Sequence, residues 1–192
     1  DYFKIEDKIS DCRWADVCYA DDELEGHKLD IYLPDTGKSS HKVVVLIYGS
    51  AWFANNMKQN AFQVFGRSLL DKGFAVVSIN HRSSRDAKFP AQINDVKAAI
   101  RFIRANAAKY KLDTSFIGIT GFSSGGHLAS LAGTTNGVKS YTIGDKTVDL
   151  EGNVGEYFSF SSRVDAVVDW FGPIDMTRME NCNTTKGANS PE

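Results

Sequence analysis

Short unbroken runs of apolar residues recur along this chain, separated by stretches in which apolar residues have helical spacing. Residues 43–48 and 74–79 are runs of β-branched and large side chains, typical of parallel strands buried on both faces. Residues 116–120 have the pattern of a short strand, and residues 164–171 are another buried run. Residues 28–34 alternate apolar and polar side chains, as a half-buried strand does. We expect each of these segments to be a strand.

Helical patterns fill the intervals between the expected strands. Phe62, Phe65 and Leu69 lie at helical spacing, and Gly73 follows them as a C-terminal glycine would. The clearest helix begins at Pro90, because a proline in the first turn loses no intrahelical hydrogen bond. Its apolar stripe is Ile93, Val96, Ile100, Ile103 and Ala107; outside the stripe lie Lys97, Arg101 and Arg104, and Asp95 is expected on the helix exterior. Alternating strands and helices predict an α/β fold with a mostly parallel sheet.

Two segments lack a clear period. Residues 134–162 are interpreted as a long surface insertion, and a loop of that length is usually functional or mobile. Residues 1–27 are ambiguous, and we expect an antiparallel edge strand there. The length of 192 residues fits a single domain over residues 1–192 with a substantial core.

Composition narrows the classes of partner. With 22 Lys and Arg against 24 Asp and Glu, the chain has a formal charge of −2, which favours neither nucleic acid nor an anionic membrane surface. No apolar run approaches the ~20 residues that span a bilayer. We expect no metal and no cofactor. Of the three cysteines, Cys12 and Cys18 could be bridged or free, and Cys182 has no near neighbour in sequence. A secreted or periplasmic location is favoured over a cytoplasmic one.

The strongest chemical signal is the stretch Gly121-Phe122-Ser123-Ser124-Gly125, which fits G-x-S-x-G. A strand precedes it and a small-residue helix, residues 123–133, follows it, as in the sharp elbow that lifts a nucleophilic serine above a sheet. The glycine spacing selects Ser123 as the catalytic nucleophile and leaves the backbone N–H of Ser124 for an oxyanion. The alternative interpretation is that Ser123 only caps a helix.

A second candidate element is Tyr48-Gly49-Ser50-Ala51-Trp52, directly after the first buried run. An ester hydrolysis passes through a tetrahedral oxyanion, which needs preorganised donors. Small residues let the backbone N–H groups of Ser50 and Ala51 approach that oxyanion, so with Ser124 they form the expected oxyanion hole. Trp52 is the candidate substrate-binding residue, and it could line an acyl or sugar pocket. The alternative is an ordinary turn with a packed tryptophan.

The chain resembles the α/β-hydrolase esterase and lipase families, in particular bacterial carbohydrate esterases of the acetylxylan and feruloyl esterase type. The resemblance runs from about residue 28 to residue 175 and includes K-L-D-I-Y-L-P, Y-G-S-A-W, G-F-S-S-G-G-H-L-A and V-V-D-W-F-G-P-I-D. It implies an α/β-hydrolase fold with helices on both faces of the sheet. The family usually has H-G-G-G-W in the second motif, so Tyr48 replaces a histidine and Ser50 and Ala51 replace glycines.

The catalytic base and acid are not evident in this chain. The order in this fold is serine, then acid, then histidine, and of His27, His41, His81 and His127 only the last follows Ser123. His127 lies four residues on along the same helix, so we expect it below the site in a structural role.

The resemblance implies an acid and a histidine beyond residue 192. The chain is therefore expected to lack the C-terminal strands of the fold, and at least one further strand should pair with residues 164–171. Asp175 is interpreted as a turn or helix cap, and Asp169 as a residue within the strand.

These features favour a serine carboxylic-ester hydrolase that forms an acyl-enzyme on Ser123. The resemblance suggests a small-molecule or polysaccharide ester as substrate, with acetyl or feruloyl groups. A serine peptidase of the prolyl-oligopeptidase kind and a catalytically inactive binding module of the same fold are the alternatives. The sequence does not indicate an oligomeric state.

Overall fold

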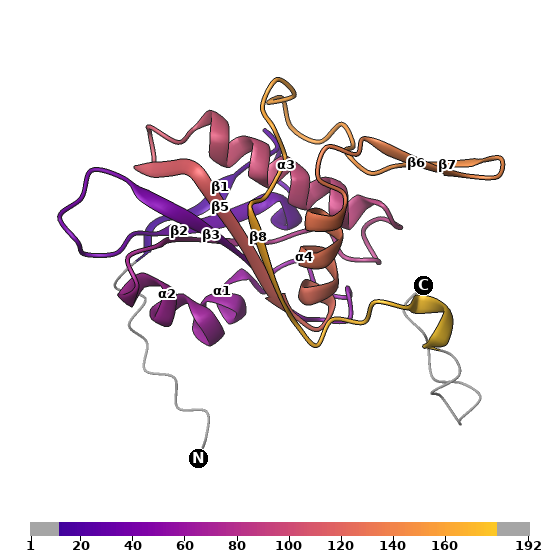
Figure 1. Ribbon diagram of the computed structural model, residues 1–192, viewed down its shortest axis with the longest axis horizontal. Helices are drawn as coiled ribbons and strands as arrows, with labels where there is room; N and C mark the ends of the chain where they lie inside the picture. The colour runs from indigo at the N-terminus through magenta and orange to yellow at the C-terminus, as the bar shows by residue number, and fades with distance from the viewer. Residues whose placement is uncertain (1–11, 180–192) are drawn as a thin grey trace, which may run out of the picture.

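A six-stranded sheet runs through the centre of the computed structural model, which describes residues 12–179 (Figure 1). The strand order is β1-β2-β4-β3-β5-β8. The bounds are β1 Cys12–Cys18, β2 Lys28–Tyr32, β3 His41–Ile47, β4 Ala75–Ile79, β5 Leu112–Phe122 and β8 Ala166–Trp170. All five segments expected as strands are strands in the structure.

The sheet is parallel on one side and antiparallel on the other. β4, β3, β5 and β8 pair in parallel, whereas β2 pairs antiparallel with β4, and β1 with β2. The antiparallel edge expected near the start of the chain is therefore confirmed by β1, and residues 1–11 lie outside the described part. The mostly parallel α/β sheet is confirmed as well.

Helices cover both faces of the sheet (Figure 1). Alternate residues of β3 point into two separate cores: Val43 and Val45 pack in the cluster that holds α3 and α4, and Val44 and Leu46 pack in the cluster that holds α1 and α2. This is why the run in β3 is apolar without interruption. The bounds are α1 Lys58–Ala61, the π-helical turn η2 Phe62–Gly66, α2 Arg67–Asp71, α3 Ala91–Ala105, α4 Ser124–Thr134, and the 3-10 turns η1 Glu25–His27 and η3 Met176–Arg178.

Helix α3 corrects the sequence analysis at its charged residues. Its predicted apolar stripe is buried, but so are Asp95, Lys97 and Arg101, each with at most 1% of its surface exposed. Glu151 explains the burial of the two cations, since its carboxylate pairs with Arg101 and lies 3.4 Å from the Lys97 ammonium. Charged residues outside the stripe of a helix are thus covered by a later segment of the chain.

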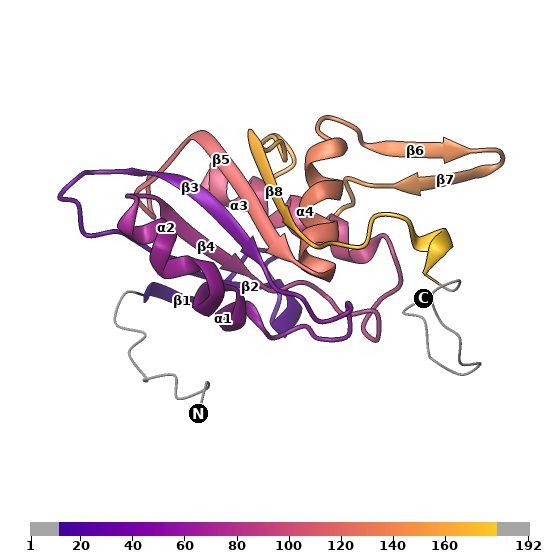
Figure 2. The ribbon, with the colours of Figure 1, turned by 60° about the horizontal axis from the view of Figure 1, so that its bottom comes forward.

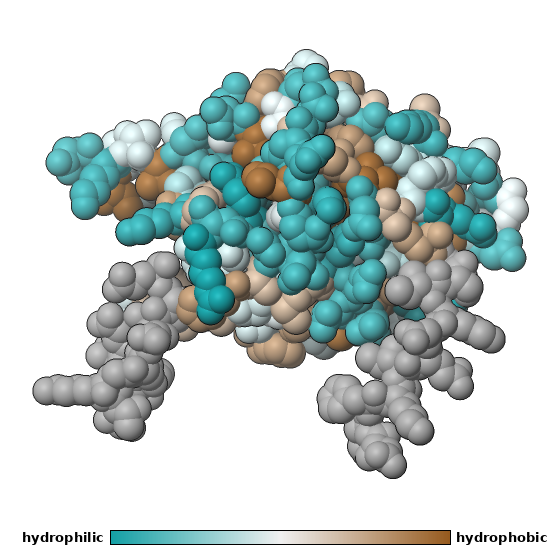
Figure 3. All heavy atoms as spheres, turned by 180° about the vertical axis from the view of Figure 1, so that it is seen from behind, coloured by the Kyte–Doolittle hydropathy of each residue, from teal (hydrophilic) through white to brown (hydrophobic). Residues whose placement is uncertain are grey.

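That segment belongs to the stretch expected to be a surface insertion. Its first part is a hairpin of β6 (Ser140–Ile143) and β7 (Lys146–Asp149) that projects from the body of the protein (Figure 2). Its second part returns over α3, where Arg104 donates hydrogen bonds to the carbonyls of Ser161 and Arg163. Residues 151–161 of this second part are all exposed or half-buried, so it covers α3 while it lies at the surface itself. Seen from behind, the surface is mostly hydrophilic, with apolar side chains in small patches (Figure 3).

Strand β8 differs from the expectation of a buried strand. It pairs with β5 and is the last strand in the sheet order, and all five of its residues are exposed. Among residues 12–179, no strand pairs with its other side. The apolar side chains of β8 are therefore exposed and can contact groups other than residues 12–179.

Two further findings concern the cysteines and the helices. Cys12 and Cys18 are free thiols, and Cys182 lies outside the described residues. Within residues 12–179, no helix combines the length and the apolar character that crossing a bilayer requires.

Candidate active site

Ser123 occupies a sharp turn between β5 and α4. Its backbone has φ 54° and ψ −127°, a conformation that L-residues rarely adopt. The preceding residue ends the strand and the following one begins the helix, and the serine itself is half-buried. Its backbone N–H donates to the carbonyl of Trp170 at 3.0 Å, which fixes the turn against β8. The strand-to-helix elbow expected from the motif is therefore present.

Glycines let the elbow approach the neighbouring backbone. A Cβ at Gly125 would lie 2.3 Å from the carbonyl oxygen of Ile47, and one at Gly121 would lie 2.5 Å from the backbone of Gly125. A Cβ at Gly49 would lie 2.8 Å from the Cβ of Ser123. The loop after β3 and the elbow after β5 thus touch through backbone atoms.

The β3–α1 loop (residues 48–57) holds the other two expected donors. Ala51 and Trp52 both have positive φ, 49° and 61°. The N–H of Ser50 donates to the side-chain hydroxyl of Ser124 at 2.9 Å. Ser50 is therefore the one of the three expected donors whose N–H is already engaged. The N–H of Ser124 lies in the first turn of α4, where backbone N–H groups have no intrahelical acceptor.

Trp52 is largely a packed residue. Only 9% of it is exposed, and its ring meets the ring of His127 edge-on, with centroids 5.3 Å apart. Its carbonyl accepts a hydrogen bond from the N–H of Ser84 at 2.8 Å. The structure thus shows Trp52 packed against α4, and its expected role in substrate binding stays a prediction. The neighbouring Phe53 is 40% exposed and lies under the guanidinium of Arg85.

Two histidines lie near the elbow. His127 donates its backbone N–H to the carbonyl of Ser123 at 3.1 Å, and burial lowers the pKa of its ring despite the charge of Asp169. The ring of His81 is fully buried, stacks on Tyr48 at 4.9 Å and bonds to the carbonyl of Arg82 at 2.8 Å. Burial lowers its pKa as well.

The other two histidines are engaged elsewhere. The ring of His27 lies between the carboxylates of Asp22 and Asp95, at 2.7 and 3.2 Å. The ring of His41 approaches the hydroxyl of Thr36 at 3.5 Å. Within residues 12–179, no histidine ring is hydrogen-bonded to the Ser123 hydroxyl, and no group of three His, Cys, Asp or Glu side chains is arranged to hold a metal ion.

Comparison with known proteins shows the family to which the chain belongs. The BD-FAE family model matches residues 29–192. The chain belongs to the BD-FAE family. Curated relatives of this BD-FAE chain include Esterase LipQ and the probable carboxylic ester hydrolase LipM, both of Mycobacterium tuberculosis. LipQ is 34% identical over 72% of the chain and LipM 33% over 87%, and these matches span 30% and 36% of the relatives' own lengths.

Two solved structures are also similar. A protein described as a bifunctional GH43-CE from Bacteroides eggerthii is 92% identical with a TM-score of 0.90; the match covers 97% of the BD-FAE chain and 26% of that protein. A truncated form of a carbohydrate esterase from gut microbiota is 64% identical with a TM-score of 0.86, and the match covers 88% of the chain and 59% of that protein. These similarities establish the α/β-hydrolase fold and the resemblance to carbohydrate esterases.

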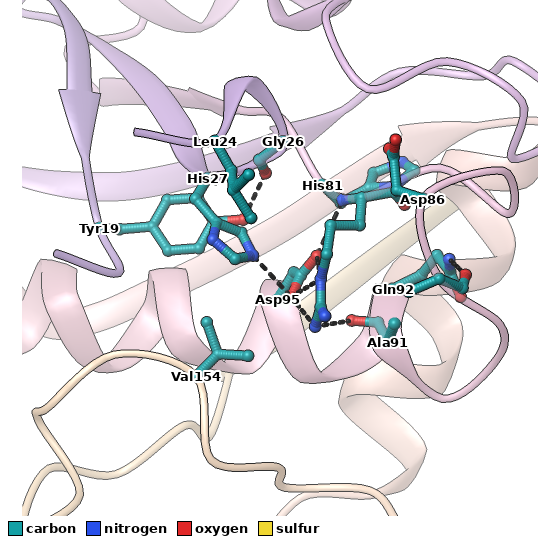
Figure 4. A network of polar contacts seen from close by, with 12 residues as sticks. Tyr19, Leu24, Gly26, His27, His81, Asp86, Ala91, Gln92, Asp95 and Val154 are labelled. Carbon is teal, nitrogen blue, oxygen red and sulfur yellow. Dashed lines mark hydrogen bonds and ion pairs between the residues drawn. The ribbon is translucent and has the colours of Figure 1, made fainter. Parts of the chain in front are cut away.

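A buried ion-pair network flanks the site of this BD-FAE chain (Figure 4). Asp95 receives hydrogen bonds from the Arg82 side chain, the shortest at 2.7 Å, and also from the Arg82 backbone N–H at 2.8 Å. His27 bonds to the same carboxylate. The network fixes the connection after β4, which also carries the Ser84 N–H that holds Trp52. Sequence reasoning missed it, because its partners come from three separate segments.

Two carboxylates match their sequence interpretation. Asp175 accepts a hydrogen bond from the N–H of Thr177 at the start of η3, so it is a helix cap as expected. Asp169 lies within β8 and accepts hydrogen bonds from Ser130 and from the N–H of Gly172, at 2.7 and 2.8 Å. It joins α4 to the end of β8 and has a structural role.

Proposed function

We propose that the full-length protein is a carboxylic-ester hydrolase that works through an acyl-enzyme on Ser123. The observation that carries this proposal is the strained backbone of Ser123, at φ 54°, between the end of β5 and the start of α4. Strain of this kind persists where the surrounding structure enforces it, and it is common at active sites. A serine that only capped a helix would not need it.

In the proposed reaction, the Ser123 hydroxyl oxygen attacks the ester carbonyl carbon while a general base takes its proton. The N–H groups of Ala51 and Ser124 would stabilise the oxyanion. The proton then goes to the departing alcohol, and an acyl-serine remains. Water, deprotonated by the same base, attacks that ester and releases the acid and the free serine. Within residues 12–179, no histidine ring is hydrogen-bonded to the Ser123 hydroxyl, so the proposal assigns the base and its carboxylate to the full-length protein outside these residues.

The proposed substrates are acetyl or feruloyl esters of plant polysaccharides. The relatives named above are esterases, which supports ester hydrolysis over peptide hydrolysis and over a purely binding role. The solved structure with 64% identity is described as a carbohydrate esterase and the one with 92% identity as a bifunctional GH43-CE, which supports a carbohydrate-borne ester.

The test uses the full-length protein with p-nitrophenyl acetate, acetylated xylan and methyl ferulate. Ser123→Ala should lower kcat/KM on every substrate that the wild type hydrolyses by at least about 10³-fold, because the nucleophile is lost. Ser130→Ala, on the same helix, is the matched control and should retain activity. Wild-type turnover by a clean Ser123→Ala preparation would show that another group is the nucleophile.

A further inference from the structure

Two side-chain contacts join α4 to the β3–α1 loop: the rings of His127 and Trp52 meet edge-on, and the hydroxyl of Ser124 makes a hydrogen bond. This hydroxyl accepts the N–H of Ser50 at 2.9 Å, and only 1% of Ser124 is exposed. Among residues 12–179, it is the only hydrogen bond between the loop and the residues of the elbow, 123–125. A buried acceptor on the first turn of a helix is a fixed point for the loop that donates to it.

The loop needs such a fixed point because two of its residues are strained. Ala51 and Trp52 are both held at positive φ, which costs non-glycine residues free energy unless other contacts impose it. Within the loop, Ser50 accepts hydrogen bonds from the N–H groups of Phe53 and Ala54, at 3.0 and 3.3 Å. These bonds define the shape of the loop but do not place it relative to Ser123.

A second tie holds the opposite side of the loop. The carbonyl of Trp52 accepts the N–H of Ser84 at 2.8 Å, and this tie leads to the connection after β4, away from the elbow. On the side of the nucleophile, the loop is held by the hydrogen bond to Ser124, by the backbone contact at Gly49 and by the packing of Trp52 on His127, and of these only the first is a hydrogen bond.

We infer that the Ser124 side chain is a positioning residue that fixes the Ala51 N–H relative to the Ser123 hydroxyl. The inference rests on the proposed function. Ser124 then has two roles: its backbone N–H is one oxyanion donor, and its hydroxyl positions the other donor, the N–H of Ala51. Ser50 leaves the set of oxyanion donors, because its N–H serves the tie.

The test compares Ser124→Ala with Ser124→Thr in the full-length protein, using p-nitrophenyl acetate. Loss of the hydroxyl should lower kcat about tenfold and leave KM within about twofold, because a misplaced donor weakens the transition state more than substrate binding. Ser124→Thr keeps the acceptor oxygen and should restore kcat to within about threefold of the wild type. Ser130→Ala removes another α4 hydroxyl, which donates to Asp169 at 2.7 Å, and should leave kcat unchanged.

A kcat for Ser124→Ala within about twofold of the wild type, or an equal loss in Ser130→Ala, would overturn the inference. Should Ser124→Ala melt near the assay temperature, its rate of reaction with an alkyl phosphonate in the cold, followed by intact mass, gives the same comparison, since that reaction uses the same donors. A wild-type labelling rate would then overturn it. Ser123→Ala distinguishes failure of the proposed function from failure of the positioning role. If Ser123→Ala stays active, the proposed function fails. If Ser123→Ala is inactive and Ser124→Ala is fully active, only the positioning role is rejected.

Discussion

At the scale of single residues, the buried carboxylate of Asp95 holds the start of α3 to the connection after β4. It is fully buried and bonds to the side chains of Arg82 and His27. Removing one member of a buried ion pair leaves the other charge without compensation. Because the same connection supports Trp52, the network also stabilises one side of the candidate site.

Asp95→Ala should therefore destabilise the folded protein by about 3 kcal/mol. The free energy of unfolding from urea titration measures this. Asp145→Ala, at the exposed tip of the hairpin, is the control and should change it by less than about 0.5 kcal/mol. Equal effects of the two substitutions would show that the network contributes no more than a surface charge.

The same network predicts a dependence of stability on pH. Burial alone lowers the pKa of His27, but the carboxylates of Asp95 and Asp22 outweigh it and raise the pKa above its ordinary value. A raised pKa in the folded state means that protonated His27 stabilises the fold at low pH and that this contribution is lost as pH rises through the folded pKa.

The free energy of unfolding of the wild type minus that of His27→Gln should consequently be larger at about pH 5.5 than at about pH 8.5. The subtraction removes the effects of His81 and His127, whose lowered pKa values act in the opposite direction. A difference that stays constant or grows with pH would contradict the assignment.

Residue roles could be predicted only where they depend on local sequence. Ser123 follows from its motif, because the strand, the glycines and the helix are all neighbours in the chain. The engagement of Ser50 could not be predicted, since its acceptor on Ser124 lies 74 positions away. The burial of Trp52 likewise depends on His127, a residue of another element.

At the scale of elements, the segment after α4 has two parts: the hairpin of β6 and β7, and the residues after it, which cover α3. Leu150 donates its N–H to the carbonyl of Lys139 at 2.8 Å, so the ends of the hairpin are already joined. Glu151, directly after it, forms ion pairs with both the buried Lys97 and the buried Arg101. The two parts should respond differently to change.

Replacing residues 142–147 by Asn-Gly should preserve stability. The replacement keeps the pair Tyr141 and Val148 and supplies a two-residue turn that suits a hairpin. The melting temperature should change by less than about 2 °C, whereas Glu151→Ala should lower the free energy of unfolding by about 3 kcal/mol, because two buried cations lose their partner. A shortened hairpin as unstable as Glu151→Ala would show that the hairpin tip is part of the core.

The elements themselves were largely predictable, since buried parallel strands appear as unbroken apolar runs and α3 has a clear apolar stripe. The burial of the charged residues on the outer side of α3 could not be predicted. Periodicity tells which side of a helix faces the sheet, but it does not tell whether a distant segment covers the other side, as Glu151 and its neighbours do here.

At the scale of the whole molecule, β8 is the last strand of the sheet formed by residues 12–179, and none of these residues pairs with its other side. Val168 and Trp170 are about half exposed, at 50% and 46%, and Phe171 directly after them is 78% exposed. Unpaired strand edges with apolar side chains template pairing with other chains. The parallel α/β architecture could be predicted from the sequence, but the exposure of this strand could not, because its apolar run is equally compatible with burial.

Residues 1–192 produced alone should therefore self-associate at micromolar concentration. Light scattering after size exclusion should show species larger than the 21.2 kDa chain. Val168→Lys places a charge on this edge strand and should shift the population toward the monomer. A monomeric wild-type polypeptide under the same conditions would show that β8 does not mediate association.

The glycines around the elbow have a consequence for how the protein tolerates change. Gly49, Gly121 and Gly125 do not have positive φ, so their requirement is steric: a single added carbon would lie within 2.8 Å of neighbouring atoms. In a saturation library, alanine should be rejected at these positions as firmly as tryptophan. Other positions of the β3–α1 loop should show graded preferences. Because only glycine fits at these positions, the glycines recur at a fixed spacing around the serine. This spacing can be recognised in a single sequence, so the elbow can be predicted without comparing relatives.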